Sequence, residues 1–200
     1  MKAFLNDPKI KTKYLKRINA HIKADELVKG MAGKDGKGCA VWCTLDKYDH
    51  KSYETELGIP EWLARVEDTI FEGLPLERSQ TWPKEFLKAI KPGVDLSQVE
   101  APFVIFILQS NLENFDQKKY PDVKKVIETC INLYEIGDLE DSAAWSAAES
   151  AARSAAWSAA WSAARSAARS AAWSAARSAA RSAAYEKFAD KLLEILKACK

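Results

Sequence analysis

The residues best suited to chemistry are a cysteine and nearby histidine and acidic side chains. Cys39 follows a glycine-rich segment and precedes an apolar run, where a helix is expected to begin. A thiol at a helix N-terminus has a lowered pKa and becomes nucleophilic. His50 or His21 would act as the base, and Glu54 or Glu56 would orient the imidazole. The arrangement Cys39, His50 and Glu54 is the one we carry forward as a cysteine-dependent hydrolase or transferase site.

The same cysteine also forms a metal-like pattern with Cys43. Cys39-x3-Cys43 together with His50 and His21 would supply the four sulfur and nitrogen ligands that zinc prefers. The spacing is wider than that of a CxxC knuckle, however. On a helix it places both thiols on one face, where free cysteines usually serve as small buried hydrophobes. We favour this structural interpretation and expect no cofactor.

Tryptophan and arginine recur along the C-terminal tract. From Ser142 the chain reads Ser-Ala-Ala-X eleven times, and the last X is Tyr185. Arginine can bind phosphate and tryptophan can stack on bases, so nucleic-acid binding is one hypothesis. The net charge of only +2 argues against it. The interpretation we favour is structural: the tryptophans fill the core, while the arginines stack on them or pair with acids four residues away. If the tract also forms an interaction surface for protein, its residues are Trp145, Trp157, Trp161, Trp173, Arg153, Arg165, Arg169, Arg177 and Arg181.

Start and stop signals of helices divide the rest of the chain. Caps, prolines and glycines predict helices at Pro8 to Gly30, Ser52 to Gly58, Pro60 to Gly73, Trp82 to Gly93, and Pro121 to Gly137. The apolar run within 96–115 is interpreted as a buried helix, with a buried strand as the alternative. The short apolar segment Gly38 to Leu45 fits a helix or a strand. We favour a helix, because the segments around it are helical.

The Ser-Ala-Ala-X tract predicts one very long helix. No Gly or Pro occurs between Leu139 and Lys200, and alanine is the best helix former. A helix from about 139 to 196 would be about 85 Å long. Each X is rotated about 40° from the last, so the large residues spiral around the axis. We expect the preceding helices to wrap this helix, and we regard supercoiling with a partner chain as the alternative.

Bulk properties indicate a soluble cytoplasmic protein. The N-terminus lacks the apolar region of a signal peptide. The longest uncharged stretch of the tract, Ser154 to Ala164, is far shorter than the roughly 20 residues that span a bilayer. Four scattered cysteines are too few for a disulfide framework. We therefore expect no membrane association.

Several blocks together resemble a bacterial protein family of uncharacterised function. They are the Gly38-Cys39-Ala40-Val41-Trp42-Cys43 segment, the Gly58-Ile59-Pro60-Glu61-Trp62-Leu63-Ala64-Arg65 block, the Ile70-Phe71-Glu72-Gly73-Leu74-Pro75 block and the alanine-rich C-terminal tract. The resemblance implies a natural, evolved fold along the whole chain. It carries no activity.

These observations lead to one architecture and three ranked functions. We predict an all-α fold, in which a compact domain of residues 1–137 is wrapped on a tetrad-repeat helix of residues 138–200. The leading function is a non-enzymatic interaction or scaffold protein that binds a protein partner or itself. A cysteine-dependent enzyme is the alternative, and nucleic-acid binding through the Arg/Trp spiral is third.

Overall fold

The computed structural model describes residues 1–113, 118, 121–136 and 171–200, with the backbone alone for 171–178. All regular structure in these ranges is helical, which confirms the all-α fold class. Contacts divide the chain into two units. Unit 1 consists of Met1–Glu100 and Ala180–Lys200, and unit 2 of Ala101–Ala179. Unit 1 is therefore assembled from two segments that are distant in sequence.

The helices follow one another with short connections. In chain order they are η1 (Ala3–Asn6, a 3-10 helix), α1 (Pro8–Lys23), α2 (Ala40–Leu45), α3 (Ser52–Leu57), α4 (Glu61–Gly73), α5 (Leu76–Ser79), α6 (Trp82–Ala89), η2 (Leu96–Gln98, a 3-10 helix), α7 (Glu100–Glu113), α8 (Pro121–Ile136) and α10 (Ala171–Ala198). The segment whose type was ambiguous is the helix α2. The helix α5 was not expected.

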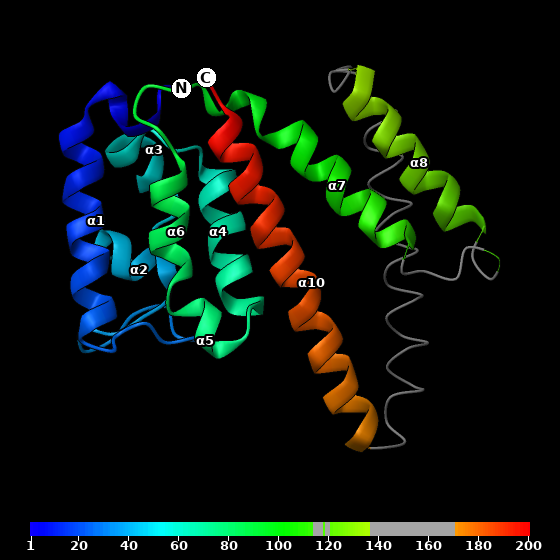
Figure 1. Ribbon diagram of the computed structural model, residues 1–200, viewed down its shortest axis with the longest axis horizontal. Coiled ribbons are helices and arrows are strands. Elements are labelled where there is room, and N and C mark those ends of the chain that lie inside the picture. Colours follow the sequence, from blue (N-terminus) through cyan, green and yellow to red (C-terminus); the bar gives the residue numbers. More distant parts are fainter. Residues whose placement is uncertain (114–117, 119–120, 137–170) are drawn as a thin grey trace. The chain divides into compact units, whose positions relative to one another are not determined.

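Unit 1 is a layered helical body around one core. Helix α1 packs on α6 and α2, while α2, α3 and α6 all contact α4, as Figure 1 shows. Its largest fully buried side chains are Trp82, Tyr14, Tyr53, Phe4, Phe71, Phe86, Ile18, Leu57, Ile59, Leu63 and Leu74. Burying each such side chain contributes about 1.5–3 kcal/mol. These apolar faces position every polar group discussed below.

Helix α1 shows how local signals set an element's limits. The carboxylate of Asp7 accepts a hydrogen bond of 2.8 Å from the backbone N–H of Lys9, and Pro8 occupies the first helical position. The helix ends at Lys23, earlier than the expected Gly30. Leu27 instead pairs with Gly38 in a parallel bridge and is buried there. Leu27 is therefore a buried residue of the loop and not part of helix α1.

The first turn of the chain is left-handed. Phe4, Leu5 and Asn6 have φ angles of 52°, 51° and 59°, a conformation that costs about 1–2 kcal/mol per residue outside glycine. Phe4 is fully buried. Ala3 also exchanges backbone hydrogen bonds with the 93–94 segment, at 3.0 and 2.8 Å. Burial and this pairing hold the strained turn in place.

Helix α6 receives an unusual cap from α1. It begins at Trp82-Pro83 as expected but ends at Ala89, before Pro92. The Lys11 ammonium donates to the carbonyls of Lys88 and Ile90 at 2.9 and 2.6 Å. A cation at a helix C-terminus satisfies carbonyls that lack partners within the helix. Lys11 therefore ties α1 to the end of α6.

Unit 2 contains α7 and α8 among its described residues. Both helices lie where the sequence predicts them, with Phe103 buried on α7, and Cys130 and Leu133 buried on α8. The expected helix of residues 139–196 is described from Ala171 onward as α10. Residues 137–170, and with them the expected domain boundary, lie outside the described residues.

None of the described helices has an apolar stretch long enough to cross a membrane.

Candidate functional site

Cys39 lies where the glycine-containing loop meets α2. The Leu27–Gly38 bridge brings the chain to this point, and the backbone N–H of Cys39 donates to the carbonyl of Met31 at 2.8 Å. Cys39 is the residue that precedes α2. Gly33 and Gly38 lie under the indole of Trp42, so closely that a Cβ at Gly33 would overlap the ring. The close approach of loop and helix thus depends on glycine at these two positions.

Predicted site residues from two loops meet at Asp68 of α4. The imidazole Nε2 of His50 lies 3.2 Å from Asp68 Oδ2. The hydroxyl of Tyr48 donates to the same oxygen at 3.4 Å, and the Tyr48 ring meets the imidazole edge-on at 4.9 Å. The Cys39 thiol donates to the carbonyl of Ala32 at 3.9 Å, and it lies near enough to Asp68 for that charge to raise its pKa. The structure therefore brings Cys39 and His50 together around a carboxylate.

That carboxylate is not the one expected from the sequence. Glu54 Oε1 accepts a hydrogen bond of 3.0 Å from the backbone N–H of Glu61 and so caps α4. Glu56 accepts from the Tyr14 hydroxyl at 2.5 Å and pairs with Lys47 at 2.9 Å. None of these interactions of Glu54 and Glu56 involves His50. The carboxylate that contacts the His50 imidazole is Asp68 and not the predicted Glu54.

The pKa of the Cys39 thiol is raised, whereas the sequence predicted that it would be lowered. Only 2% of the residue is exposed. Burial raises the pKa of the thiol well above its ordinary value, and the nearby Asp68 charge adds to this rise. The backbone N–H of Trp42 lowers the pKa, but by less. Desolvation outweighs the start of a six-residue helix, so Cys39 is a neutral thiol at physiological pH.

A second buried acid lies beside this cluster. Glu67 is fully buried; the Tyr53 hydroxyl donates to its Oε2 at 2.7 Å, and the Trp82 indole N–H donates to its carbonyl at 3.0 Å. Burial raises the pKa of Glu67 to about 8. Glu67 Oε1 and Asp68 Oδ1 have no hydrogen-bond partner. Such orphan oxygens cost stability, so this region is a polar inclusion within the core.

The four residues of the metal pattern separate into different networks. The Cys43 thiol donates to the carbonyls of Gly38 and Glu26 at 3.4 and 3.6 Å, and burial raises its pKa to about 12. His21 binds the carboxylates of Glu26 and Asp46 at 2.6 and 3.3 Å. Across the described ranges, no three His, Cys, Asp or Glu side chains are grouped to hold a metal ion.

The predicted interaction residues of the tract are described only in part. Trp173 and Arg177 lie on the described backbone of α10, while Trp145, Trp157, Trp161, Arg153, Arg165 and Arg169 lie outside the described residues. The Arg181 guanidinium lies 5.7 Å from the centre of the Tyr185 ring. Arginine thus stacks on an aromatic X residue, the kind of contact expected for the tract.

The C-terminal part of α10 packs within unit 1, against residues of the N-terminal segment. The Tyr185 ring lies on Gly73, where a Cβ would overlap it, and meets the Phe188 ring edge-on at 5.9 Å. Beyond it, the apolar face of α10 is buried at Ala189, Leu192, Leu193, Leu196 and Cys199. The C-terminal end of this helix is therefore amphipathic.

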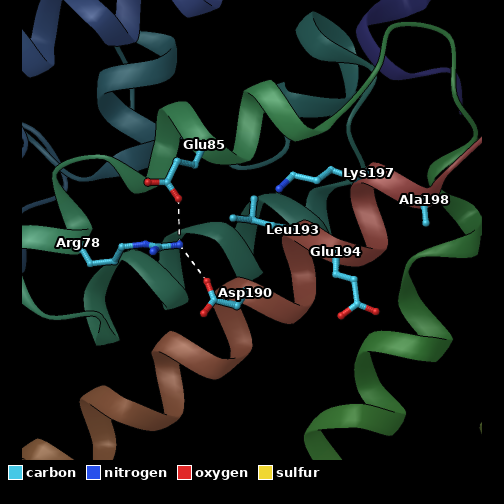
Figure 2. Close-up of a pocket in the computed structure, with 7 residues that line it drawn as sticks. All are labelled: Arg78, Glu85, Asp190, Leu193, Glu194, Lys197 and Ala198. Atoms are coloured by element: carbon cyan, nitrogen blue, oxygen red, sulfur yellow. Dashed lines mark hydrogen bonds and ion pairs between the residues drawn. The ribbon is translucent and has the colours of Figure 1, made fainter.

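A charged group bridges α10 and the preceding helices. Arg78 Nη2 lies 3.0 Å from Asp190 on α10 and 2.9 Å from Glu85 on α6, as Figure 2 shows. Around this bridge lies an open groove of about 700 Å³, lined by Arg78, Glu85, Asp190, Leu193, Glu194, Lys197 and Ala198. The lining mixes both signs of charge with an apolar floor. It offers contacts for a partner, with neither a thiol nor an imidazole for chemistry.

Comparison of the chain with protein-family models, curated proteins and solved structures finds no match to any of them.

Proposed function

We propose that this chain is a non-enzymatic interaction or scaffold protein of the cytoplasm. In this proposal a compact helical domain, residues 1–137, holds the tetrad-repeat helix, residues 138–200, and that helix contacts other protein molecules. The observation that carries the proposal is the seating of α10. Tyr185, the last X of the repeat, packs on Gly73, and four apolar residues beyond it are buried up to Leu196.

The geometry of the repeat supports a role in binding. In this proposal the helix continues through the repeat, and each X residue is rotated about 40° from the last, which would direct the Trp side chains to several sides. One neighbouring surface cannot cover them all. The remainder of unit 1, or a protein partner or second copy, would be needed to bury them. Tryptophan and arginine are also the residues that dominate binding energy at protein interfaces.

The cysteine-dependent enzyme is supported less well. The convergence of Cys39 and His50 on Asp68 favours it, because a base held by a carboxylate is the expected arrangement. The raised pKa and burial of Cys39 weigh against it, since the thiolate is the nucleophile. The polar cluster packs instead as part of the core. Nucleic-acid binding by the Arg/Trp spiral gains no support from the contact of Arg181 with Tyr185.

The test compares the full chain with a variant in which Trp145, Trp157, Trp161 and Trp173 are replaced by alanine. We expect self-association in sedimentation equilibrium, or retention of a defined protein in affinity purification, that the variant loses. The substitution Trp62→Ala, outside the tract, is the control. A full chain that is monomeric and retains the same proteins as the four-tryptophan variant would refute the proposal.

A further inference from the structure

Helix α1 carries a row of lysines on its solvent side. Lys9, Lys13, Lys16 and Lys23 are all exposed. Residues three, four and seven positions apart share one face of a helix, and the one intervening position of this row is Ala20. At a rise of about 1.5 Å per residue, the row extends about 21 Å. We call these four residues the lysine face.

The other cationic groups of α1 are used within the protein. Lys11 caps α6, Arg17 pairs with Asp46 at 3.1 Å, and His21 contacts two carboxylates. Helix α1 itself contains no acidic residue. Among the described residues, Lys9, Lys16 and Lys23 have no ion-pair partner, while the Lys13 ammonium lies 4.8 Å from the centre of the Tyr14 ring. Lys13 also acts on Glu56, whose pKa is lowered mainly by the Tyr14 hydroxyl and Lys47. Lys9, Lys16 and Lys23 are therefore left with uncompensated positive charge.

Part of the lysine face forms a shallow groove. Lys9, Lys13 and Lys16, together with Pro8 and Thr12, line a volume of about 490 Å³. The Thr12 hydroxyl donates to the carbonyl of Pro8 at 3.0 Å. The lining contains no aromatic or large aliphatic side chain. The surface thus presents ammonium groups at the ends of aliphatic lysine stems to a ligand.

The near-neutral charge of the whole chain conceals this asymmetry. Residues 1–51 contain twelve Lys and Arg but only six Asp and Glu. The excess of acidic residues elsewhere balances them. A surface potential depends on how charges are distributed and not on their sum alone.

We propose that the lysine face docks on the phosphate backbone of double-stranded nucleic acid. A duplex carries one negative charge per about 1.7 Å of its axis, which complements a straight row of ammonium groups. A single strand would need exposed aromatic residues for stacking. A bilayer would call for apolar residues to insert, and a protein partner for an apolar anchor. The lysine face has none of these.

The first experiment measures fluorescence anisotropy of a labelled duplex of about 20 base pairs with the full chain. Four lysine–phosphate contacts predict a slope of about −3.6 in log affinity against log salt. Affinity should therefore fall roughly 100-fold between 50 and 200 mM salt. Absence of binding at 50 mM salt, or a slope near zero, overturns the proposal.

The second experiment locates the binding surface. The variant K9Q/K13Q/K16Q should bind at least tenfold more weakly at 50 mM salt, with a slope of about −0.9. The control K51Q/K88Q/K91Q removes the same charge from other exposed positions and should bind like the original chain. The variant K9R/K13R/K16R should retain binding, and circular dichroism checks that each variant folds. Equal losses in the first two variants overturn the proposal.

A third measurement separates a duplex from a membrane. Vesicles of phosphatidylserine and phosphatidylcholine are sedimented with the full chain and with K9Q/K13Q/K16Q at the same salt. Vesicle binding that requires these lysines, without duplex binding, assigns the lysine face to an anionic membrane and overturns the proposal. Duplex binding that requires them, with no such loss on vesicles, supports it.

Discussion

The ring of Tyr185 lies directly on Gly73, so the last large residue of the tetrad repeat rests on the final turn of α4. Only a residue without a side chain permits this approach. The contact joins residues far apart in sequence and fixes the rotation of α10 about its own axis.

Replacing Gly73 by alanine should destabilise unit 1. A Cβ at this position would overlap the Tyr185 ring, and forced overpacking typically costs about 1–3 kcal/mol. Urea unfolding measures the free energy of unfolding of Gly73→Ala, Tyr185→Ala and the double variant. We expect the double variant to be more stable than the sum of the single effects predicts, because the clash is then absent. Simple additivity would show that the two residues do not touch.

The seating of α10 should depend on apolar burial more than on its ion pair. Leu192 is fully buried, and Leu192→Ala should cost about 2–5 kcal/mol. Asp190 is largely exposed where it meets Arg78, so Asp190→Asn should cost less than about 1 kcal/mol and even less in high salt. Thermal or urea unfolding measures both. Equal costs for the two substitutions would contradict this ranking.

The Cys39 thiol should be unreactive in the folded protein. Burial raises its pKa, which leaves little thiolate at pH 7.5. Iodoacetamide labelling followed by mass spectrometry should show Cys39 modified at least 100-fold more slowly than a free cysteine, with rapid modification once urea unfolds the chain. Fast labelling of the native protein would contradict this prediction and support the hypothesis of a cysteine-dependent enzyme.

The buried Glu67 should make stability fall as pH rises. Its pKa is raised to about 8 by burial, whereas an unfolded chain leaves it near about 4.3. Between these values the folded state holds a proton that the unfolded state has released, so the free energy of unfolding decreases with increasing pH. The lowered pKa values of Asp49, Glu56 and Asp95 place their own effects below this window.

The measurement is urea unfolding of the original chain and of Glu67→Gln between pH 5 and pH 8. Glutamine is neutral throughout, so the variant should lose part of the pH dependence. Other groups that titrate in this range affect both proteins alike. Parallel pH profiles would contradict the raised pKa.

The helices were largely predictable because their ends are marked locally. Proline or a cap begins α1, α6 and α8, and glycine follows or ends α3 and α4. Where a residue serves a distant partner, the local pattern misleads. Leu27 continues the apolar spacing of α1 but belongs to the bridge with Gly38, so the expected helix was too long.

The polar cluster was predictable only in part. Cys39 and His50 do share a carboxylate, yet sequence proximity pointed to Glu54, while the fold supplies Asp68 from α4. Burial then reversed the expected pKa of Cys39, since desolvation depends on packing that no spacing reveals. The burial of Glu67 could have been predicted from its spacing to apolar residues of α4. Glu67 stands four residues after Leu63 and three before Ile70, on the apolar face of α4.

Unit 1 draws its last layer from residues 180–200, which a ribosome synthesises only after everything they cover. The apolar surface of residues 1–100 that buries Leu192 and Leu196 therefore stays bare while about 80 further residues are translated. A nascent chain in this state is a target for chaperones that bind hydrophobic surfaces. Completion of the body is a late event in its biogenesis, set by the order of translation.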